Sequence, residues 1–459
     1  MKEKLSYEEL LLENHMQREC IDALMIRVQD LEKQIGKTSA NSSKPPSTNG
    51  YKKVVQNNRE KTDKKSGGQP NHKGNYLKYA EGEDIDELSY VSVSGSCSCG
   101  ADLSTTGLAI EYERRQVFEI PRLRPYVTEY QVERKQCSCG KIHRAVCEEA
   151  PYAVQYGSNV SAGASYFHNR QLLPIKRTQE ILSDIFGFTQ ISEGFICNSS
   201  STGYDRLSEW EEVQIVRLQN SPILHVDETG LGVGGKRIWG HVGSTKEITL
   251  YQHHAKRGKL AHEAHKLLDN FTGVLVHDRY SSYNSYSCSH SLCNAHLLRE
   301  LKSLIEDGQI WAKMMYKLLN EAHKGIINAI DLEKNYQESL NLGFVDNPLP
   351  DNIPKQKGKF KKTASQNLLE CFKNRKAEIL RFYYQQDVPF DNNLAERDLR
   401  MFKLKQKING TFRTENGAKY FCRIASFIAT LKKQGDNVWE NLCVLYRNKY
   451  QFQSNNASF

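Results

Sequence analysis

Three acidic residues that lie far apart in the sequence have types and positions suited to metal-dependent chemistry. Asp227 follows the apolar run 222–226, Asp278 follows the apolar run 273–277, and Glu396 lies in a predicted helix. Carboxylate oxygens are the ligands that Mg²⁺ prefers, whereas cysteine and histidine favour zinc. Two Mg²⁺ ions held by three carboxylates neutralise charge on a phosphodiester and activate an oxygen nucleophile. The pattern therefore predicts phosphodiester hydrolysis or transfer.

The segments around Asp227 and Asp278 predict how these two acids are brought together. Apolar runs predict strands at 222–226, 237–243, 247–253 and 273–277, and a helix at 259–268. The order βββαβ is that of a ribonuclease-H-like core, in which the first and fourth strands lie side by side. Glu228 adjoins Asp227, but alternation along a strand points it to the opposite face, so we expect its replacement to be milder.

Glu396 lies in the first turns of a helix that Asp391 or Asn392 can cap. Apolar residues of this helix are expected to pack inward: Leu394, Leu399 and Phe402. Cations that follow Glu396 would approach a bound phosphodiester: Arg397, Arg400, Lys403, Lys405 and Lys407. The alternative for an isolated Glu-Arg pair is a surface ion pair.

The long segment between Asp278 and Glu396 predicts a helical insertion over about 292–385. Residues 355–376 contain eight lysine or arginine residues and one acidic residue, Glu370. Such a cluster suits contact with DNA phosphates, and a solvated lysine-rich loop is the alternative. The residues predicted to contact DNA are Arg397, Arg400, Lys403, Lys355, Lys359, Lys361 and Lys362.

Two C-x-C cysteine pairs lie in residues 76–150, where short alternating patterns predict β structure with a candidate strand at 126–132. The pairs are Cys97 with Cys99 and Cys137 with Cys139. Four thiolates brought together by two turns satisfy tetrahedral zinc, so we expect a small zinc-binding β module. Reduced structural thiols are the alternative, and Cys147 or His143 can substitute if one pair supplies a single ligand.

The remaining segments are predicted to assemble the protein and to bind DNA. Residues 1–36 have a heptad pattern that predicts a coiled-coil helix, with packing on its own chain as the alternative. Residues 37–75 predict a basic flexible linker. Residues 151–220 predict helices, and 177–197 has the length and glycine-containing turn of a helix-turn-helix or of an ordinary helical hairpin. The catalytic domain is expected over 221–430, followed by a helical tail over 431–459.

Composition agrees with a multidomain globular protein. The chain has 459 residues, 39% hydrophobic residues and a formal net charge of +9. We find no signal-peptide pattern and no uncharged apolar run of about 18 residues, so we expect a cytoplasmic protein. In a reducing compartment, the 12 cysteines favour metal ligands or buried thiols over disulfides.

Six short motifs, in order along nearly the whole chain, resemble the transposases of the bacterial insertion sequence 66 family. The motifs are 41–46 (NSSKPP), 67–74 (GGQPNHKG), 225–229 (HVDET), 278–284 (DRYSSYN), 293–296 (CNAH) and 391–397 (DNNLAER). By this resemblance Asp227, Asp278 and Glu396 match the DDE triad, while Cys293 and His296 match a C-x-x-H element found between the second and third acids. We expect Cys293 and His296 to have a structural role near the active site; a second zinc site that also includes Cys288 and His290 is the alternative, although the spacing of the four residues is cramped. The chain departs from the family at Arg279, in both C-x-C pairs and at 405–409 (KQKIN).

The resemblance implies a DNA transposase with a DDE triad that cleaves element ends and transfers strands. It implies two Mg²⁺ or Mn²⁺ ions per active site, a structural Zn²⁺, homo-oligomerisation on DNA, and accessory proteins encoded by the element. The protein would act at the nucleoid of a bacterial cytoplasm. The alternatives are a ribonuclease-H-like nuclease without strand transfer and a non-enzymatic zinc and helix-turn-helix DNA-binding protein.

Overall fold

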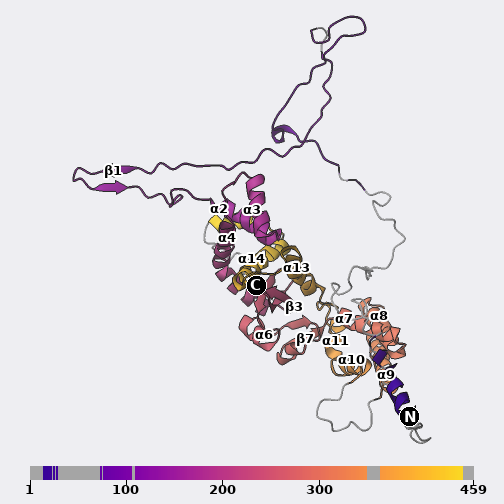
Figure 1. The fold of residues 1–459 in the computed structure, drawn as a ribbon. Coiled ribbons are helices and arrows are strands. Elements are labelled where there is room, and N and C mark those ends of the chain that lie inside the picture. The colour runs from indigo at the N-terminus through magenta and orange to yellow at the C-terminus, as the bar shows by residue number, and fades with distance from the viewer. Residues whose placement is uncertain are drawn as a thin grey trace, which may run out of the picture. The chain divides into compact units, whose positions relative to one another are not determined.

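The computed structural model describes most of the chain. The described residues are 14–31 except 23, 26, 29 and 30, then 73–74, 76–105, 109–348 and 362–447. The chain divides into two compact units, one of residues 55–124 and one of residues 1–54 together with 125–459. The larger unit contains the strands and α-helices that Figure 1 labels.

A mixed five-stranded sheet is the framework of the larger unit, with strand order β5-β4-β3-β6-β7. Its strands are β3 (Ile223–Val233), β4 (Lys236–Ser244), β5 (Thr249–His254), β6 (Val274–His277) and β7 (Ser289–Leu292). The β3–β4 and β4–β5 pairs are antiparallel, and the β3–β6 and β6–β7 pairs are parallel. Helix α6 (Lys259–His265) connects β5 to β6, so the elements follow the predicted βββαβ order.

Strand β3 is longer than the sequence predicts. It continues beyond Asp227 as a hairpin with β4, in which Val233 pairs with Lys236. Gly234 and Gly235 form the turn with φ of +53° and +75°, a conformation that glycine adopts without steric cost. Asp227 therefore lies inside β3, two residues after the part of β3 that pairs with β6.

Helices cover both faces of the sheet. Leu231 of β3 shares a hydrophobic cluster with Phe402 of α13 (Asn393–Asn409), while Leu224 shares another with Leu218 of α5 (Ser208–Gln219). Because successive residues of a strand point to opposite faces, β3 presents Asp227 to the α13 layer and the next residue to the α5 layer. In Figure 1, α13 and α14 (Glu415–Gln434) lie on one side of β3 and α6 on the other.

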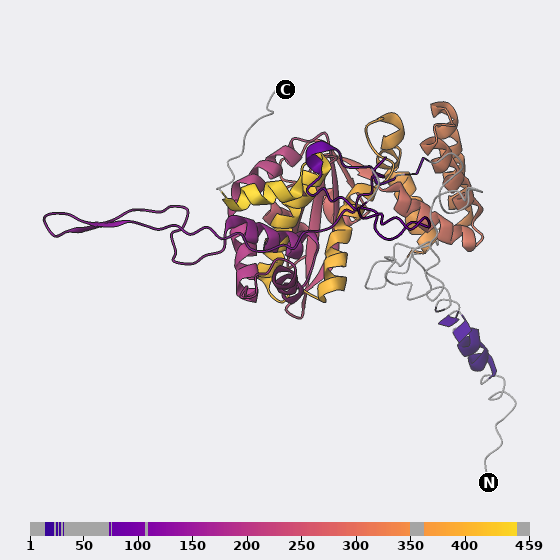
Figure 2. The same ribbon diagram turned by 90° about the horizontal axis from the view of Figure 1, so that it is seen from above.

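A lobe of helices is formed by the residues that follow β7 and precede α13 in the sequence. Its helices are α7 (Asn294–Glu306), α8 (Ile310–His323), α9 (Ala329–Asp346), α10 (Ala364–Asn374), α11 (Lys376–Ile379) and α12 (Arg381–Tyr384). The lobe has its own hydrophobic core around Trp311, Tyr336 and Phe372, all completely buried. Figure 2 shows it, in orange, beside the sheet. These helices fall within the predicted insertion at about 292–385.

Helices that precede the sheet in the sequence pack against a helix near the C-terminus. The elements of this group are α2 (Ser158–Ser165), a π-helical turn (Tyr166–Arg170), α3 (Ile175–Asp184), α4 (Glu193–Arg206) and α15 (Val438–Arg447). The segment with the helix-turn-helix pattern forms α3 and α4, joined through Gly187 at φ +78°. Ser192 caps α4 by accepting a hydrogen bond from the Phe195 N–H.

The segment predicted to be a small β module has little regular structure. Among its described residues, the strands are β1 (Arg134–Gln136) and β2 (Ile142–Arg144), and the boundary between the two units falls at residue 124. The expected strand at 126–132 is wrong. Its side chains have no layer to pack against: Tyr126 is 96% exposed and Val127 82%. Alternation without a partner surface does not stabilise a strand.

The described residues within 14–31 are helical. Four apolar residues at the heptad positions, Ile21, Leu24, Val28 and Leu31, are at least half exposed. Leu10, Ile35 and nearly all of the linker at 37–75 lie outside the described residues. No helix in the part of the chain that the structure describes has the length and apolarity needed to cross a membrane.

Candidate active site

Asp227 and Asp278 are brought together by the parallel pairing of β3 with β6. His225 pairs with Val276, and continuing that register by two residues places Asp227 opposite Asp278. Main-chain N–H groups orient both carboxylates: Glu228 N donates to Asp227 Oδ1 at 2.8 Å, and Tyr280 N donates to Asp278 Oδ1 at 2.8 Å. Asp227 thus lies in β3 and Asp278 directly follows the adjacent strand β6, and backbone N–H groups fix both carboxylates.

Glu396 is positioned by an asparagine at the start of its helix. Asn392 is the N-cap residue of α13, yet its side chain makes no capping bond. Instead Asn392 Nδ2 donates to Val226 O at 2.8 Å, and Asn392 Oδ1 lies 2.9 Å from His225 Nδ1. Only 1% of Asn392 is exposed. This residue therefore fastens the helix that holds Glu396 to the strand that holds Asp227.

The three carboxylates interact electrostatically. Burial, followed by the negative charges of Glu228, Asp278 and Glu396, holds the pKa of Asp227 well above its usual range. Repulsion among carboxylates in a poorly hydrated site has this effect because it penalises the ionised form. A divalent cation bound among them would relieve the repulsion.

Three side chains from the start of α7 surround the Glu396 carboxylate. Cys293 Sγ lies 3.8 Å and His296 Nδ1 3.6 Å from Oε1, while Arg299 Nη2 lies 3.9 Å from Oε2. Cys293 also accepts a hydrogen bond from Asn392 N at 3.2 Å, and burial raises its pKa to about 12. The C-x-x-H element therefore lies against the third acid, on a helix that begins directly after β7.

Glu228 lies on the opposite side of β3, where its buried carboxylate forms an ion pair with the partly exposed Arg257, a contact that the sequence did not reveal. Arg257 Nη2 lies 2.8 Å from Glu228 Oε1, and Tyr283 Oη donates to Oε2. Burial and the Asp278 carboxylate raise the pKa of Glu228 to about 7. No sequence motif predicts the ion pair between Glu228 and Arg257, because Arg257 lies in a loop whose position depends on the tertiary fold.

The predicted DNA-contacting cations have different environments. Arg397 and Arg400 are exposed on α13, and Lys403, also exposed, donates to Gly230 O at 2.9 Å. Lys362 pairs with Glu370, and Lys355, Lys359 and Lys361 lie outside the described residues. Lys405 is not available to DNA: it is buried and donates to His168 O at 3.1 Å. Helical periodicity places it on the inner face of α13, together with Phe402.

The two C-x-C pairs adopt the same local turn. Cys97 N bonds to Ala101 O and Gly100 N to Cys97 O, and Cys137 N bonds to Lys141 O and Gly140 N to Cys137 O. Gly100 and Gly140 have φ of +90° and +85°. Hydrogen bonds from the second cysteine of each pair lower the pKa of the first cysteine. One pair belongs to each structural unit.

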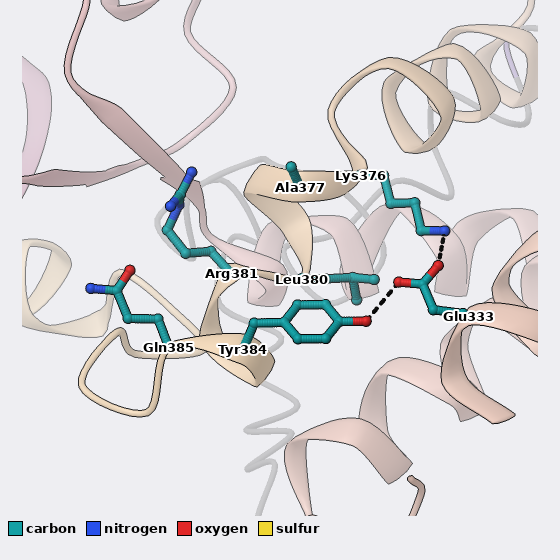
Figure 3. Close-up of a pocket in the computed structure, with 7 residues that line it drawn as sticks. All are labelled: Glu333, Lys376, Ala377, Leu380, Arg381, Tyr384 and Gln385. Atoms are coloured by element: carbon teal, nitrogen blue, oxygen red, sulfur yellow. Dashed lines mark hydrogen bonds and ion pairs between the residues drawn. The ribbon is translucent and has the colours of Figure 1, made fainter. Parts of the chain in front are cut away.

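The helical lobe contains an open pocket of about 670 Å³. Figure 3 shows its lining: Glu333, Lys376, Ala377, Leu380, Arg381, Tyr384 and Gln385. Glu333 pairs with Lys376 and accepts a hydrogen bond from Tyr384 Oη. None of the three acids lines this pocket, so it is separate from the carboxylate site.

The raised pKa of Asp227 predicts a pH-dependent gain in stability for Asp227→Asn. The folded chain holds this proton more tightly than the unfolded chain, so ionisation lowers stability as pH rises above the unfolded pKa of about 3.9. With metal chelated, we expect Asp227→Asn to melt about 2 °C or more above wild type at pH 8. The difference should shrink toward pH 4.

Differential scanning fluorimetry across this pH range measures the effect. Asp307→Asn, at the exposed end of α7, is the matched control and should melt with wild type throughout. Added Mg²⁺ should raise the wild-type melting temperature and close the difference, because a ligand that binds the folded state stabilises it. A melting temperature of Asp227→Asn below wild type at pH 8 would contradict the electrostatic interpretation.

Comparison with known protein families identifies the class of the protein. A family model described as "Transposase IS66 family" matches residues 153–420, more than half of the chain, and this range contains all three acids. A second model, described as a family of unknown function, matches residues 2–78. No match was found among curated proteins.

The family match defines a transposase, a DNA-processing enzyme. The chain belongs to the IS66 transposase family, as its six motifs predicted. DNA is accordingly its substrate class.

Proposed function

We propose that this transposase binds the ends of an insertion sequence and catalyses cleavage and strand transfer through a DDE triad of Asp227, Asp278 and Glu396. The observation that supports this most strongly is the joint positioning of the three acids. Asp227 lies in β3, Asp278 directly follows the adjacent parallel strand β6, and Asn392 ties the helix of Glu396 to β3. We interpret the sheet and its flanking helices as a ribonuclease-H-like core.

The triad fits divalent cations with a preference for oxygen ligands. All three side chains offer carboxylate oxygens, and burial together with the neighbouring carboxylates raises the pKa of Asp227, a penalty on its ionised form that a cation would relieve. Asp227, Asp278 and Glu396 would hold two Mg²⁺ or Mn²⁺ ions. When bound, such ions neutralise phosphate charge and generate the nucleophilic oxygen, first from water and then from the freed 3′-hydroxyl.

The rest of the chain supplies DNA contacts. Arg397 and Arg400 are exposed one and four residues after Glu396 on the same helix, close enough to pair with phosphates beside the triad. Lys403, Lys362 and the basic residues Lys355, Lys359 and Lys361 extend this contact. Helices α3 and α4 would bind the element end as a helix-turn-helix.

A cleavage and joining assay tests the proposed function. Full-length protein is incubated with Mg²⁺, labelled duplexes that carry its element ends, and a supercoiled target plasmid. A transposase gives both cut ends and end–plasmid joints. Cutting without joints would support a nuclease with the same core, and binding without cutting would support a non-enzymatic DNA-binding protein.

We also propose that Cys97, Cys99, Cys137 and Cys139 bind one structural zinc ion. The identical turns, each with a positive-φ glycine, orient two sulfur atoms per turn, and the lowered pKa of Cys97 and Cys137 favours the thiolates that zinc binds. Cys147 and His143 remain the substitutes. A small segment with so little core requires such a ligand to fold.

Metal analysis of full-length protein checks the zinc proposal. We expect Cys97→Ser with Cys137→Ser to lose about one zinc per chain and to make residues 76–150 sensitive to protease. Cys197→Ser, an exposed cysteine in α4, is the control and should retain the metal. Equal zinc content in the double variant and the control would contradict the proposal.

For assembly, we propose that the N-terminal helix pairs with a second copy as a coiled coil. Its exposed apolar residues Ile21, Leu24, Val28 and Leu31 recur at heptad spacing. A homo-oligomer would hold two DNA ends together, with accessory element-encoded proteins as further partners. Because its substrate is DNA, we place the protein at the nucleoid in the bacterial cytoplasm.

A further inference from the structure

Cys293, His296 and Glu396 bring three different metal-ligand atoms together. The Cys293 sulfur, a His296 ring nitrogen and a Glu396 oxygen all lie within 4.8 Å of one another. Within the part of the chain that the structure describes, this is the group of metal-ligating side chains that meets that spacing. The three residues come from two elements, the start of α7 and the first turn of α13.

A hydrogen bond from the Cys293 thiol to Glu396 Oε1 accounts for the position of Cys293, but no hydrogen bond accounts for that of His296. His296 Nδ1 is buried and has no hydrogen-bond partner. Its distance of 3.6 Å from Glu396 Oε1 exceeds the usual range for an N–H···O bond of about 2.7–3.2 Å. A buried nitrogen without a hydrogen-bond partner lowers the stability of the fold, and a bound metal ion would supply the missing partner of His296 Nδ1.

The spacing is that of ligands around one ion. Zinc bonds of about 2.3 Å to sulfur and about 2.0 Å to nitrogen or oxygen place tetrahedral donors about 3.3–3.5 Å apart. The observed distances to Glu396 Oε1 are 3.8 Å from Cys293 Sγ and 3.6 Å from His296 Nδ1. Small side-chain adjustments would therefore complete a site, while Glu396 Oε2 faces Arg299.

We propose that Cys293, His296 and Glu396 form a second kind of metal site, which binds a thiophilic divalent cation such as Zn²⁺ and thereby withdraws Glu396 from the Mg²⁺ site. Binding breaks the Cys293 S–H bond, releases that proton to solvent and forms a sulfur–metal bond. His296 contributes the Nδ1 lone pair and keeps its proton on Nε2. The two negative ligands balance the charge of the cation.

The donor set explains why the two metals would compete. Sulfur and imidazole ligands select zinc, whereas Mg²⁺ binds oxygen ligands and retains its waters. Zinc held by Cys293 and His296 would take Glu396 Oε1, so the triad would lose its third ligand. This inhibition rests on the proposed function of Glu396, whereas the binding of the metal does not.

Cobalt titration of full-length protein tests the site directly, because a Co²⁺–thiolate bond absorbs in the near ultraviolet. After removal of bound metals, wild type should bind about one more Co²⁺ per chain than Cys293→Ser. Cys288→Ser, a half-buried cysteine outside the site, is the matched control and should bind as wild type. His296→Gln should weaken the additional site at least about tenfold. Ions at the C-x-C pairs contribute equally to every sample.

Asp227→Asn separates the two proposals. It should be inactive on DNA but bind the additional Co²⁺, because Asp227 is not a ligand of this site. Zinc should inhibit wild-type cleavage in Mg²⁺, and each variant is compared with its own rate without zinc. Cys293→Ser should require at least about tenfold more zinc for half inhibition.

Identical Co²⁺ spectra and stoichiometry in wild type, Cys293→Ser and His296→Gln would overturn the metal site. Circular dichroism establishes whether the variants are folded. If Cys293→Ser does not fold, His296→Gln still tests the site, because it keeps the hydrogen bond between Asn392 N and Cys293 Sγ. If wild type binds the additional Co²⁺ but neither cleaves nor joins DNA, the metal site is supported and the proposed function is refuted. Zinc bound at Cys293 without inhibition would refute the competition.

Discussion

Replacing Asp227 or Asp278 with asparagine, or Glu396 with glutamine, is expected to abolish DNA cleavage and strand transfer. Each change keeps the size of the side chain but removes a negative charge that would hold Mg²⁺. Loss of a ligand costs several kcal/mol of transition-state stabilisation, so rates should fall at least about a thousandfold. Single-turnover cleavage of labelled element ends measures this loss, and separate joining of pre-cleaved ends tests strand transfer.

DNA binding should survive in these variants. It depends mainly on lysine and arginine contacts with phosphates, and removal of a carboxylate lowers repulsion with the backbone. Glu228→Gln is the neighbouring control: its side chain lies on the opposite side of β3, paired with Arg257. Glutamine retains an oxygen that accepts the Tyr283 hydrogen bond, so we expect a milder loss. An inactive Glu228→Gln beside an active Asp227→Asn would move the first ligand to Glu228.

Asn392→Ala is expected to destabilise the core and to impair catalysis together. Alanine leaves Val226 O without the donor that Asn392 Nδ2 supplies and His225 without its partner, both in a buried region. The expected loss is about 2–4 kcal/mol of unfolding free energy, because buried groups would be left unpaired. Cleavage should also fall, since α13 would no longer be fastened to β3. Urea unfolding and cleavage rates measured below the transition give the two effects.

Asn393→Ala is the matched control for this substitution. Asn393 is exposed, and its main-chain and side-chain N–H groups donate to the Asp391 carboxylate. Its replacement should change the unfolding free energy by less than about 0.5 kcal/mol. Equal stability and activity for the two variants would show that Asn392 does not position Glu396.

Local pattern predicted the order of the elements because apolar runs and their charged neighbours are local features. The runs before Asp227 and Asp278 became β3 and β6, and the run around Glu396 became α13. Pattern did not predict how far β3 extends, because its second half is stabilised by pairing with β4. Nor did it predict a buried Lys405, whose environment depends on a carbonyl more than 200 residues away in sequence.

The role of Asn392 shows the same limit at the site. An asparagine before a helix predicts a cap, and it does occupy the N-cap position. Its side chain, however, bonds to His225 and Val226, which a local rule does not consider. The prediction of a strand at 126–132 was wrong for the opposite reason: the residues alternate as in a strand, but no second layer covers them. Tertiary contacts therefore decided both outcomes.

Manganese anomalous diffraction from crystals of the full-length protein with its element-end DNA tests the central claim most directly. Mn²⁺ substitutes for Mg²⁺ and scatters anomalously at its absorption edge. The proposed site predicts one or two manganese peaks bounded by the carboxylates of Asp227, Asp278 and Glu396, and their loss in Asp227→Asn crystals. Peaks held by Glu228 instead, or no peak at the triad in crystals that cleave DNA when Mn²⁺ is added, would contradict it.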